Sequence, residues 1–122
     1  MNTLFFRKWS LFLLAALFSV AVQARGLVGD IPAAQLPPEA RQTLVLIKSG
    51  GPFPYAKDGA VFGNYEGAVP KRKRGYYHEY TVKTARARDR GARRIIAGGQ
   101  SQISGEYYYT ADHYETFRLI RE

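Results

Sequence analysis

Cysteine is absent from this sequence, and its absence excludes several classes of chemistry. Without thiols the chain forms no disulfide, no thiolate metal site and no cysteine nucleophile. The folded state must therefore be stabilised by a packed hydrophobic core. Histidine is nearly as scarce, with 2 residues in 122, so any histidine-dependent proton transfer has only His78 and His113 to use.

The sequence also has no apolar run long enough for a permanent membrane span. Its apolar run extends from Leu11 to Val22, whereas a spanning helix needs about 20 apolar residues. Arg7 and Lys8 precede the run, and the small-residue site Val22-Gln23-Ala24 follows it, which is the order typical of a secretory signal peptide. We predict a cleaved signal peptide at residues 1–24, export to the periplasm or the medium, and no membrane attachment afterwards. An uncleaved N-terminal anchor is the alternative.

Acidic residues are the minority among the charged ones, with 10 Asp and Glu against 18 Lys and Arg. Removing residues 1–24 takes away two basic residues and no acidic ones, so the formal net charge falls from +8 to +6. A surface of this sign attracts polyanions such as nucleic acid, anionic lipid or cell-wall polymers. Charge alone does not choose among these partners.

The order of the predicted elements indicates an α+β fold. Residues 25–35 show no periodicity and are predicted to form a loosely held N-terminal arm, followed by one domain at residues 36–122. Pro37 and Pro38 at the start and Gly50 at the end bracket an amphipathic helix. Strands are predicted around residues 61–62, 75–82, 92–96, 106–110 and 116–120. One helix followed by strands predicts a helix packed on one face of a small antiparallel β-sheet, with the other face open.

The stretch GYYHEYTV, residues 75–82, has the residue types and the alternation of a β-strand. One face would carry Tyr76, His78, Tyr80 and Val82, and the other Tyr77, Glu79 and Thr81. We interpret His78 as a neutral imidazole that bonds to backbone on the apolar face. A carboxylate in mid-strand is unfavourable unless its face is wet or the acid has a task there, so Glu79 is the first candidate for chemistry.

Three further residues could work with this carboxylate. His113 lies in a predicted turn at residues 111–114, where its imidazole can reach solvent. Arg90 and Arg94 are four residues apart, so in an extended strand both could point to the face of Glu79 if the register allows. A carboxylate, an imidazolium and two guanidiniums are the parts needed for metal-free RNA cleavage: a base for the ribose 2'-hydroxyl, an acid for the departing 5'-oxygen, and positive charge for the phosphorane. Each arginine taken alone is better explained as a surface ion pair.

The stretches LPPEA, GPFPYAKDGAVFGN, GYYHEYTV, ARDRGARRII and YYYTADHYETFRLI occur in this order. Together they resemble the small guanyl-specific microbial ribonucleases, the barnase-like family, and especially its streptomycete branch, over about residues 36 to 121. The resemblance implies the microbial ribonuclease fold and RNA as substrate. It also implies cleavage after guanosine to a 2',3'-cyclic phosphate, which is then hydrolysed to a 3'-phosphate. Glu79 would be the general base, His113 the general acid, and Arg90 and Arg94 the phosphate clamps.

The same resemblance implies that guanine is bound by the loop after Val61. Glu66 would accept hydrogen bonds from N1 and N2 of guanine, and backbone N–H groups of Asn64 and its neighbours would meet O6. Phe62 and Tyr114 are the candidate stacking surfaces, with Tyr65 beside them. Phe62 has a second interpretation as an ordinary core residue.

The resemblance implies an acidic barstar-like protein inhibitor as a possible partner. We also expect no cofactor, no metal and a monomer. The chain departs from streptomycete relatives in lacking their disulfide and in being basic, with four consecutive basic residues at 71–74. These four form either a solvated loop or a patch that tracks phosphates. Two other functions stay open: a non-catalytic RNA or polyanion-binding module, which has no use for Glu79 and His113, and the same chemistry used as an antibacterial toxin.

Overall fold

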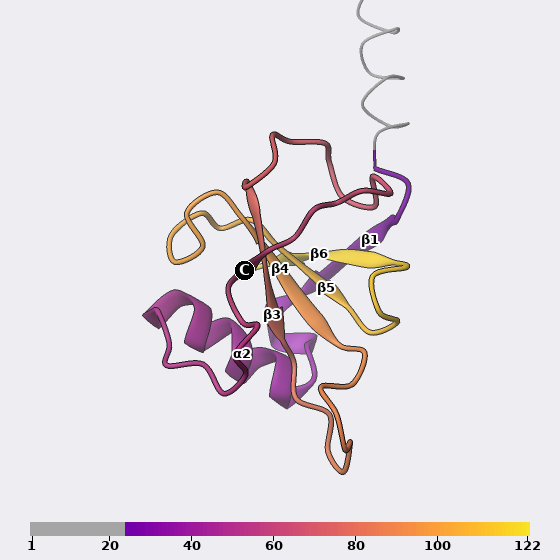
Figure 1. Ribbon diagram of the computed structural model, residues 1–122. Coiled ribbons are helices and arrows are strands. Elements are labelled where there is room, and N and C mark those ends of the chain that lie inside the picture. The colour runs from indigo at the N-terminus through magenta and orange to yellow at the C-terminus, as the bar shows by residue number, and fades with distance from the viewer. Residues whose placement is uncertain (1–23) are drawn as a thin grey trace, which may run out of the picture.

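The computed structural model describes residues 24–122 of the chain, so the predicted signal peptide lies outside the described residues except for Ala24. Figure 1 shows one α-helix beside a twisted sheet. The elements in chain order are β1 (Leu27–Pro32), the 3-10 helix η1 (Ala33–Gln35), α2 (Pro38–Ser49), β2 (Ala60–Val61), β3 (Tyr77–Thr81), β4 (Arg94–Gly98), β5 (Tyr107–Thr110) and β6 (Phe117–Arg121). Within this described part, no helix is both long and apolar enough to cross a bilayer.

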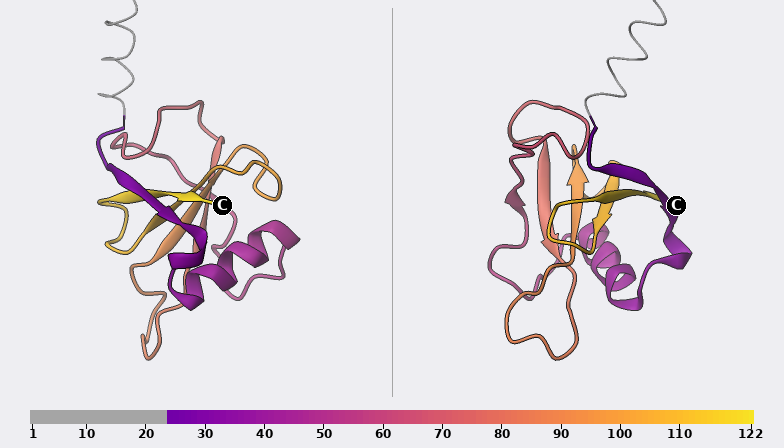
Figure 2. Two further views of the ribbon diagram at one scale, coloured as in Figure 1. Left: turned by 180° about the vertical axis from the view of Figure 1, so that it is seen from behind. Right: turned by 90° about the vertical axis from the view of Figure 1, so that its right-hand side faces the viewer.

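The six strands form one mixed sheet in the order β1-β6-β5-β4-β3-β2. All neighbouring pairs are antiparallel except β1, which runs parallel to β6. Helix α2 lies against one face of the sheet, as the views in Figure 2 show. The predicted α+β fold with a helix on a sheet is confirmed, but the sheet is mixed rather than purely antiparallel because β1, which precedes the helix, is one of its edges.

Helix α2 has the ends that its sequence predicts. Pro38 occupies its first turn, and Gly50 ends it in the left-handed conformation at φ 83°, which glycine adopts without the steric cost of a Cβ atom. Its buried side chains Ala40, Leu44 and Ile47 follow the helical repeat and face the sheet. They share a core with residues of the central strands and of β1 and β6: Ile31, Leu36, Tyr80, Val82, Ile95, Ala97, Tyr107, Tyr109 and Ile120.

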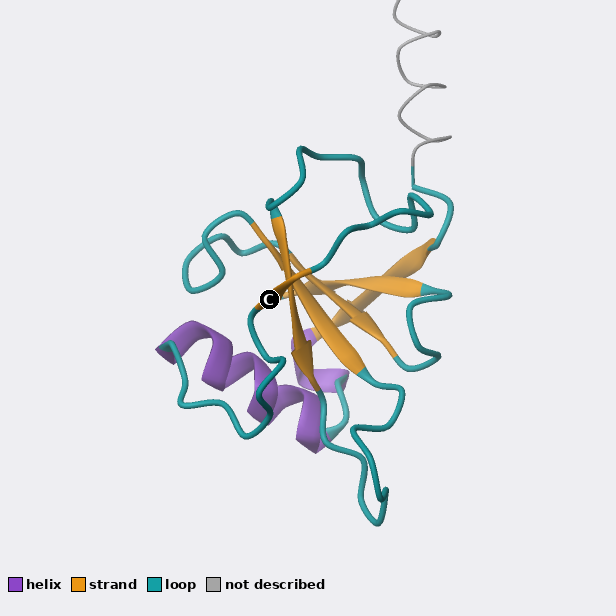
Figure 3. Cartoon of the chain, in the orientation of Figure 1, coloured by secondary structure: helices purple, strands orange, loops and turns teal. Residues whose placement is uncertain are grey.

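The opposite face of the sheet is not open as the sequence predicts, because loops instead of a helix cover part of it, which Figure 3 shows in teal. Its smaller cluster comprises Ala68, Val69, Tyr77, Ile96, Tyr108 and Phe117. The predicted alternation of β3 is confirmed for its buried residues, because Tyr77 belongs to this cluster while Tyr80 belongs to the core under the helix. Tyr76 differs from the prediction: it precedes β3 and packs on the same side as Tyr77.

Residues 25–35 are not the loosely held arm that the sequence predicts. β1 pairs along β6, where Ile31 faces Ile120, and the backbone N–H of Phe117 donates to the carbonyl of Gly26 at 2.7 Å. The pairing shifts register between Leu27 and Asp30, around Gly29 with its φ of 132°. Such a bulge breaks the period-2 pattern that identifies a strand, which is why periodicity missed it.

His78 also differs from its interpretation. No hydrogen bond to backbone is present, and its buried Nδ1 has no partner among residues 24–122. The side chain lies on the helix side of β3, where its neighbours in register are Val61 and Ala97.

Candidate active site

A pocket of about 520 Å³ brings together segments that are far apart in the sequence. The loop after β2, strand β3 and the turn between β5 and β6 each contribute to its wall. Of the predicted site residues, seven line it: Phe62, Asn64, Tyr65, Glu66, Glu79, His113 and Tyr114. Val61, Gly63, Ala68 and Glu115, which the sequence analysis did not assign to the site, complete the lining.

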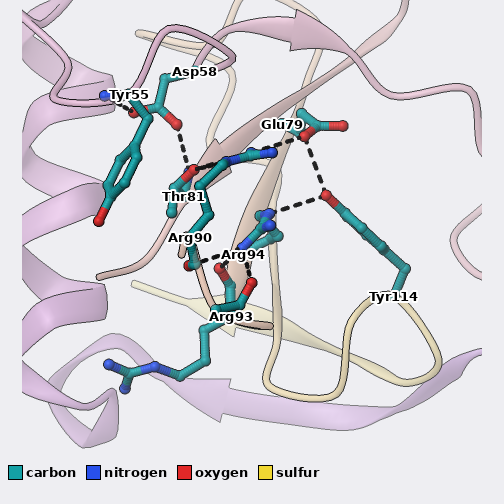
Figure 4. A network of polar contacts seen from close by, with 9 residues as sticks. Tyr55, Asp58, Glu79, Thr81, Arg90, Arg93, Arg94 and Tyr114 are labelled. Atoms are coloured by element: carbon teal, nitrogen blue, oxygen red, sulfur yellow. Dashed lines mark hydrogen bonds and ion pairs between the residues drawn. The ribbon is translucent and has the colours of Figure 1, made fainter. Parts of the chain in front are cut away.

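Glu79 is held at the floor of this pocket by two donors. Its Oε1 accepts hydrogen bonds from Nη2 of Arg90 at 3.2 Å and from the hydroxyl of Tyr114 at 3.1 Å (Figure 4). The side chain is 16% exposed, and its Oε2 accepts no hydrogen bond within residues 24–122. One carboxylate oxygen is therefore fixed while the other is available.

Arg90 and Arg94 do not line the pocket but contact residues that do: Arg90 contacts Glu79, and Arg94 contacts Tyr114. The two arginines also do not share one strand. β4 begins at Arg94, and Arg90 lies in the preceding loop. The register places Arg94 opposite Thr81 and Thr110, so its side chain emerges on the face of Glu79. Arg90 reaches the same carboxylate from the loop.

The guanidinium of Arg94 is buried yet has no acid beside it. The residue is 3% exposed, and its nitrogens donate to the hydroxyl of Tyr114 at 3.0 Å and to the carbonyls of Gly91 and Arg93 at 2.9 and 2.8 Å. No carboxylate in the described part of the chain lies within 4.0 Å of it. Neutral acceptors therefore orient the guanidinium, and no acid neutralises its positive charge. This arrangement suits the binding of an anionic ligand.

Thr81 is a site residue that sequence reasoning missed. Its Oγ1 accepts hydrogen bonds from Nε and Nη2 of Arg90 at 3.1 and 3.0 Å, and its backbone N–H donates to Oδ1 of Asp58 at 2.7 Å. Figure 4 shows the resulting chain of contacts from the loop before β2 to Glu79. The sequence feature that could have identified Thr81 is its position two residues after Glu79, which places both side chains on the same face of the strand.

Tyr114 has a polar role in addition to the predicted stacking role. Its hydroxyl donates to Glu79 and accepts from Arg94, while its ring stacks on that of Phe62 with centroids 5.4 Å apart. Burial, followed by the charge of Glu79, raises the pKa of the Tyr114 hydroxyl, so it stays protonated and remains a donor. Phe62 also packs against Phe117 and lines the pocket. It is therefore part of the core, as its second interpretation says, while its role in stacking on a base stays a prediction.

The turn that carries His113 is organised by Asp112. Oδ1 of Asp112 accepts hydrogen bonds from the hydroxyl of Thr110 and from the backbone N–H of Thr116, both at 2.9 Å. Oδ2 of Asp112 accepts a hydrogen bond from the hydroxyl of Thr116 at 2.6 Å. These bonds, chiefly those from Thr116, lower the pKa of the Asp112 carboxyl. His113 and Tyr114 both have left-handed φ, at 56° and 73°, which turns the exposed imidazole toward the pocket.

Asn64 shapes the loop that is predicted to bind guanine. Its side chain donates to the carbonyl of Val69 at 2.9 Å and accepts from the N–H of the same residue at 3.2 Å, with a backbone φ of 52°. Within residues 24–122, the backbone N–H groups of residues 63–66 donate to no acceptor. The loop thus presents free donors beside the exposed carboxylate of Glu66.

Comparison with known proteins identifies the family. The ribonuclease family model matches residues 19–121. The chain belongs to the ribonuclease family. This ribonuclease is 59% identical over 86 residues to guanyl-specific ribonuclease St of Saccharopolyspora erythraea, an alignment that covers 70% of this chain and 81% of that protein. It is 58% identical over 92 residues to guanyl-specific ribonuclease Sa of Kitasatospora aureofaciens, covering 75% and 93%.

Solved structures agree with this assignment. Ribonuclease Sa2 with guanosine-2'-cyclophosphate is 46% identical, with a TM-score of 0.69 over 76% of this chain and 95% of that one. Ribonuclease Sa2 in complexes with mononucleotides gives a TM-score of 0.72 at 46% identity, over 77% of this chain and 94% of that one. The microbial ribonuclease fold implied by the sequence is thereby confirmed. In the described residues, no group of three or more His, Cys, Asp or Glu side chains is arranged to hold a metal ion.

Proposed function

We propose that this ribonuclease is a guanyl-specific endonuclease that cleaves single-stranded RNA after guanosine, without a metal, through a 2',3'-cyclic phosphate that it then hydrolyses to a 3'-phosphate. The observation that carries the proposal is one pocket lined by Glu79, His113 and Glu66. This pocket combines a general base, a general acid and a carboxylate that can accept hydrogen bonds from guanine. The names of the relatives, guanyl-specific ribonucleases St and Sa, support the same activity.

In the first step Glu79 is the general base. Its free Oε2 takes the proton of the ribose 2'-hydroxyl, and the 2'-oxygen forms a bond to phosphorus. As the bond from phosphorus to the 5'-oxygen breaks, His113 gives its proton to that oxygen. In the second step the roles reverse. His113 takes a proton from water as the water oxygen forms a bond to phosphorus, and Glu79 gives its proton to the 2'-oxygen as the bond from phosphorus to that oxygen breaks.

The two arginines stabilise the charge that builds on the phosphorane. Arg94 suits this role because its guanidinium is pre-oriented by carbonyls and a hydroxyl and has no acid partner among the described residues. Arg90 joins the phosphate site to Glu79 through its 3.2 Å ion pair. Fixed donors of this kind act most strongly on charge that develops in the transition state.

Guanine selectivity follows from the donors on the edge of the base. N1 and N2 of guanine present two donors side by side, which one carboxylate can accept, and adenine lacks this pair. Glu66 lies at the pocket with its carboxylate exposed, and the free N–H groups of residues 63–66 are suited to O6. Leaving these polar groups unmatched should cost a wrong base several kcal/mol, an order-of-magnitude expectation.

Glu66→Gln tests the base site. The amide keeps one acceptor but sets a donor against the donors of guanine, so kcat/KM should fall about 100-fold for guanosine dinucleotides and far less for adenosine ones. Steady-state cleavage of the two substrates measures this difference. An equal loss for both would remove guanine recognition from Glu66.

The activity itself is tested with the purified protein on guanylyl and adenylyl dinucleotides in EDTA. Guanosine-selective cleavage with a cyclic phosphate intermediate is the expected result, with a bell-shaped pH profile because the base must be ionised and the acid protonated. Loss of activity in EDTA contradicts the metal-free mechanism. RNA binding without cleavage by the folded protein would instead indicate a non-catalytic binding module.

We also propose that the protein is a secreted monomer, and that an acidic protein inhibitor is its partner in the producing cell. Support for export comes from the basic residues, apolar run and small-residue site of residues 1–24. Support for the inhibitor comes from the +6 formal charge of the remaining chain, which favours an acidic partner.

A further inference from the structure

The four consecutive basic residues at 71–74 have no partner that neutralises them. All four are exposed. Within residues 24–122, none forms an ion pair with a carboxylate. The loop therefore presents four positive charges to solvent, and the polar site described above uses none of them.

These charges are held in a fixed place by the surrounding backbone and aromatic residues. The carbonyl of Pro70 accepts from the hydroxyl of Tyr77, and the carbonyl of Lys73 accepts from the backbone N–H of Tyr76 at 3.1 Å. The guanidinium of Arg72 lies 5.4 Å from the ring centroid of Tyr76. The basic loop is thus anchored to the start of β3.

Arg74 fastens this loop to the wall of the pocket. Its Nη1 donates to the hydroxyl of Tyr65 at 2.7 Å, and its guanidinium lies 5.7 Å from the ring centroid of that tyrosine. Tyr65 lines the pocket although it is 86% exposed. Its ring lies so close over Gly63 that a Cβ atom there would stand 2.4 Å from the ring, so this arrangement requires glycine at position 63.

The position of the loop sets which part of an RNA strand it can meet. The connection from β2 to β3 carries residues 63–66, the proposed guanine loop, and residues 71–74, the basic loop, at one end of β3. Arg90 lies in the connection at the other end of β3 (Figure 1). In the proposed function, the scissile phosphate, which is on the 3' side of guanosine, lies at Arg90 and Arg94. The RNA nucleotides on the opposite side of guanosine, toward the basic loop, are therefore those on its 5' side. We propose that residues 71–74 form a subsite for the phosphates of nucleotides 5' to the cleaved guanosine.

This subsite rests on the proposed function, and it makes cleavage depend on substrate length. A guanylyl dinucleotide carries no 5' phosphate and does not reach the basic loop. A longer strand with a 5' extension places successive phosphates beside it, where each contact contributes to binding through counterion release. The extension should lower KM more than it changes kcat.

The experiment compares three substrates: guanylyl-cytidine, the same cleavage site with a 5' tail of four uridines, and the same site with a 3' tail of four uridines. The loop variant is Lys71→Gln/Arg72→Gln/Lys73→Gln, which leaves the contact between Arg74 and Tyr65 unchanged. The matched control, Arg41→Gln/Lys57→Gln/Arg118→Gln, removes the same charge from three exposed residues outside the pocket lining.

The loop variant should lose about tenfold in kcat/KM on the 5'-tailed substrate at low salt, while the other two substrates change less than about twofold. The slope of log KM against log salt should fall by about 2, since each lost single-strand phosphate contact contributes about 0.7. The control should affect both tailed substrates equally and weakly. An equal loss on both tails, or no loss on the 5' tail, overturns the subsite.

Two further arms separate this proposal from its alternatives. Binding of each tailed oligonucleotide, measured by fluorescence anisotropy, decides the subsite even if no substrate is cleaved, in which case the proposed function fails by itself. Vesicles containing phosphatidylglycerol form the second arm. Vesicle binding that is lost in the loop variant, with unchanged oligonucleotide binding, would assign the loop to a lipid surface and overturn the proposal.

Discussion

At the scale of single residues, the site is a set of side chains that hold one another in place. Glu79 is fixed through one oxygen, Arg90 is fixed by Thr81, and Tyr114 joins the carboxylate to Arg94. The sequence predicts that Glu79, His113 and the two arginines lie near one another, and the structure places Glu79 and His113 in one pocket with the arginines beside it; their catalytic roles stay predictions. The positioning roles of Thr81 and of the Tyr114 hydroxyl could not be predicted, because they arise only when β3, β4 and the turn after β5 meet.

Tyr114→Phe isolates the polar role of this tyrosine. The ring remains to stack on Phe62, but Glu79 loses a donor and Arg94 loses an acceptor, so kcat should fall about tenfold, equivalent to about 1.4 kcal/mol, with KM within about twofold. Steady-state kinetics on a guanylyl dinucleotide measures this. Tyr55→Phe, outside the pocket lining, is the matched control. Wild-type kcat and KM in Tyr114→Phe would mean that Tyr114 acts by stacking alone.

At the scale of secondary structure elements, the helix and the central strands follow from capping residues and alternation, while β1 depends on its partner strand. Ile31 is buried at 8% exposure, whereas Val28 on the same strand is 58% exposed. Ile31→Ala should therefore lower the free energy of unfolding by about 2–4 kcal/mol. Val28→Ala should change it by less than about 0.5 kcal/mol. Urea denaturation compares the two, and equal small effects would mean that β1 contributes little.

The turn from Thr110 to Thr116 contributes stability that depends on pH. Hydrogen bonds from Thr116 lower the folded-state pKa of Asp112 below its usual value of 3.8, so their contribution is present above that value and is lost as pH falls through the lowered pKa. Thr116→Val should cost about 0.5–1 kcal/mol at pH 7.

Urea denaturation across pH tests this sign. The difference between Thr116→Val and wild type should shrink as pH falls from about 4 toward 2, because Asp112 becomes protonated in both proteins. A difference that stays constant through this range would show that the hydroxyl of Thr116 stabilises the turn independently of the Asp112 charge.

At the scale of the whole molecule, one face of the sheet packs on the helix and the other carries the pocket. This division was predictable from the strand at residues 75–82, whose two faces differ in character. The mixed topology was not, because a bulge at Gly29 hides the period of β1 and a parallel edge strand leaves no turn signal next to its partner. The guanine loop was assigned by resemblance alone, since its free N–H groups depend on the Asn64 and Val69 contacts.

The separate tasks of Glu79 and His113 are the central claim, and a substrate with a good leaving group tests them most directly. On guanosine 3'-(4-nitrophenyl phosphate), the departing nitrophenolate needs no proton, so His113→Ala should retain nearly wild-type rates although it fails on guanylyl-cytidine. Glu79→Ala should be impaired on both substrates, because the 2'-hydroxyl still needs a base. Equal impairment of the two variants on the nitrophenyl ester would contradict the account.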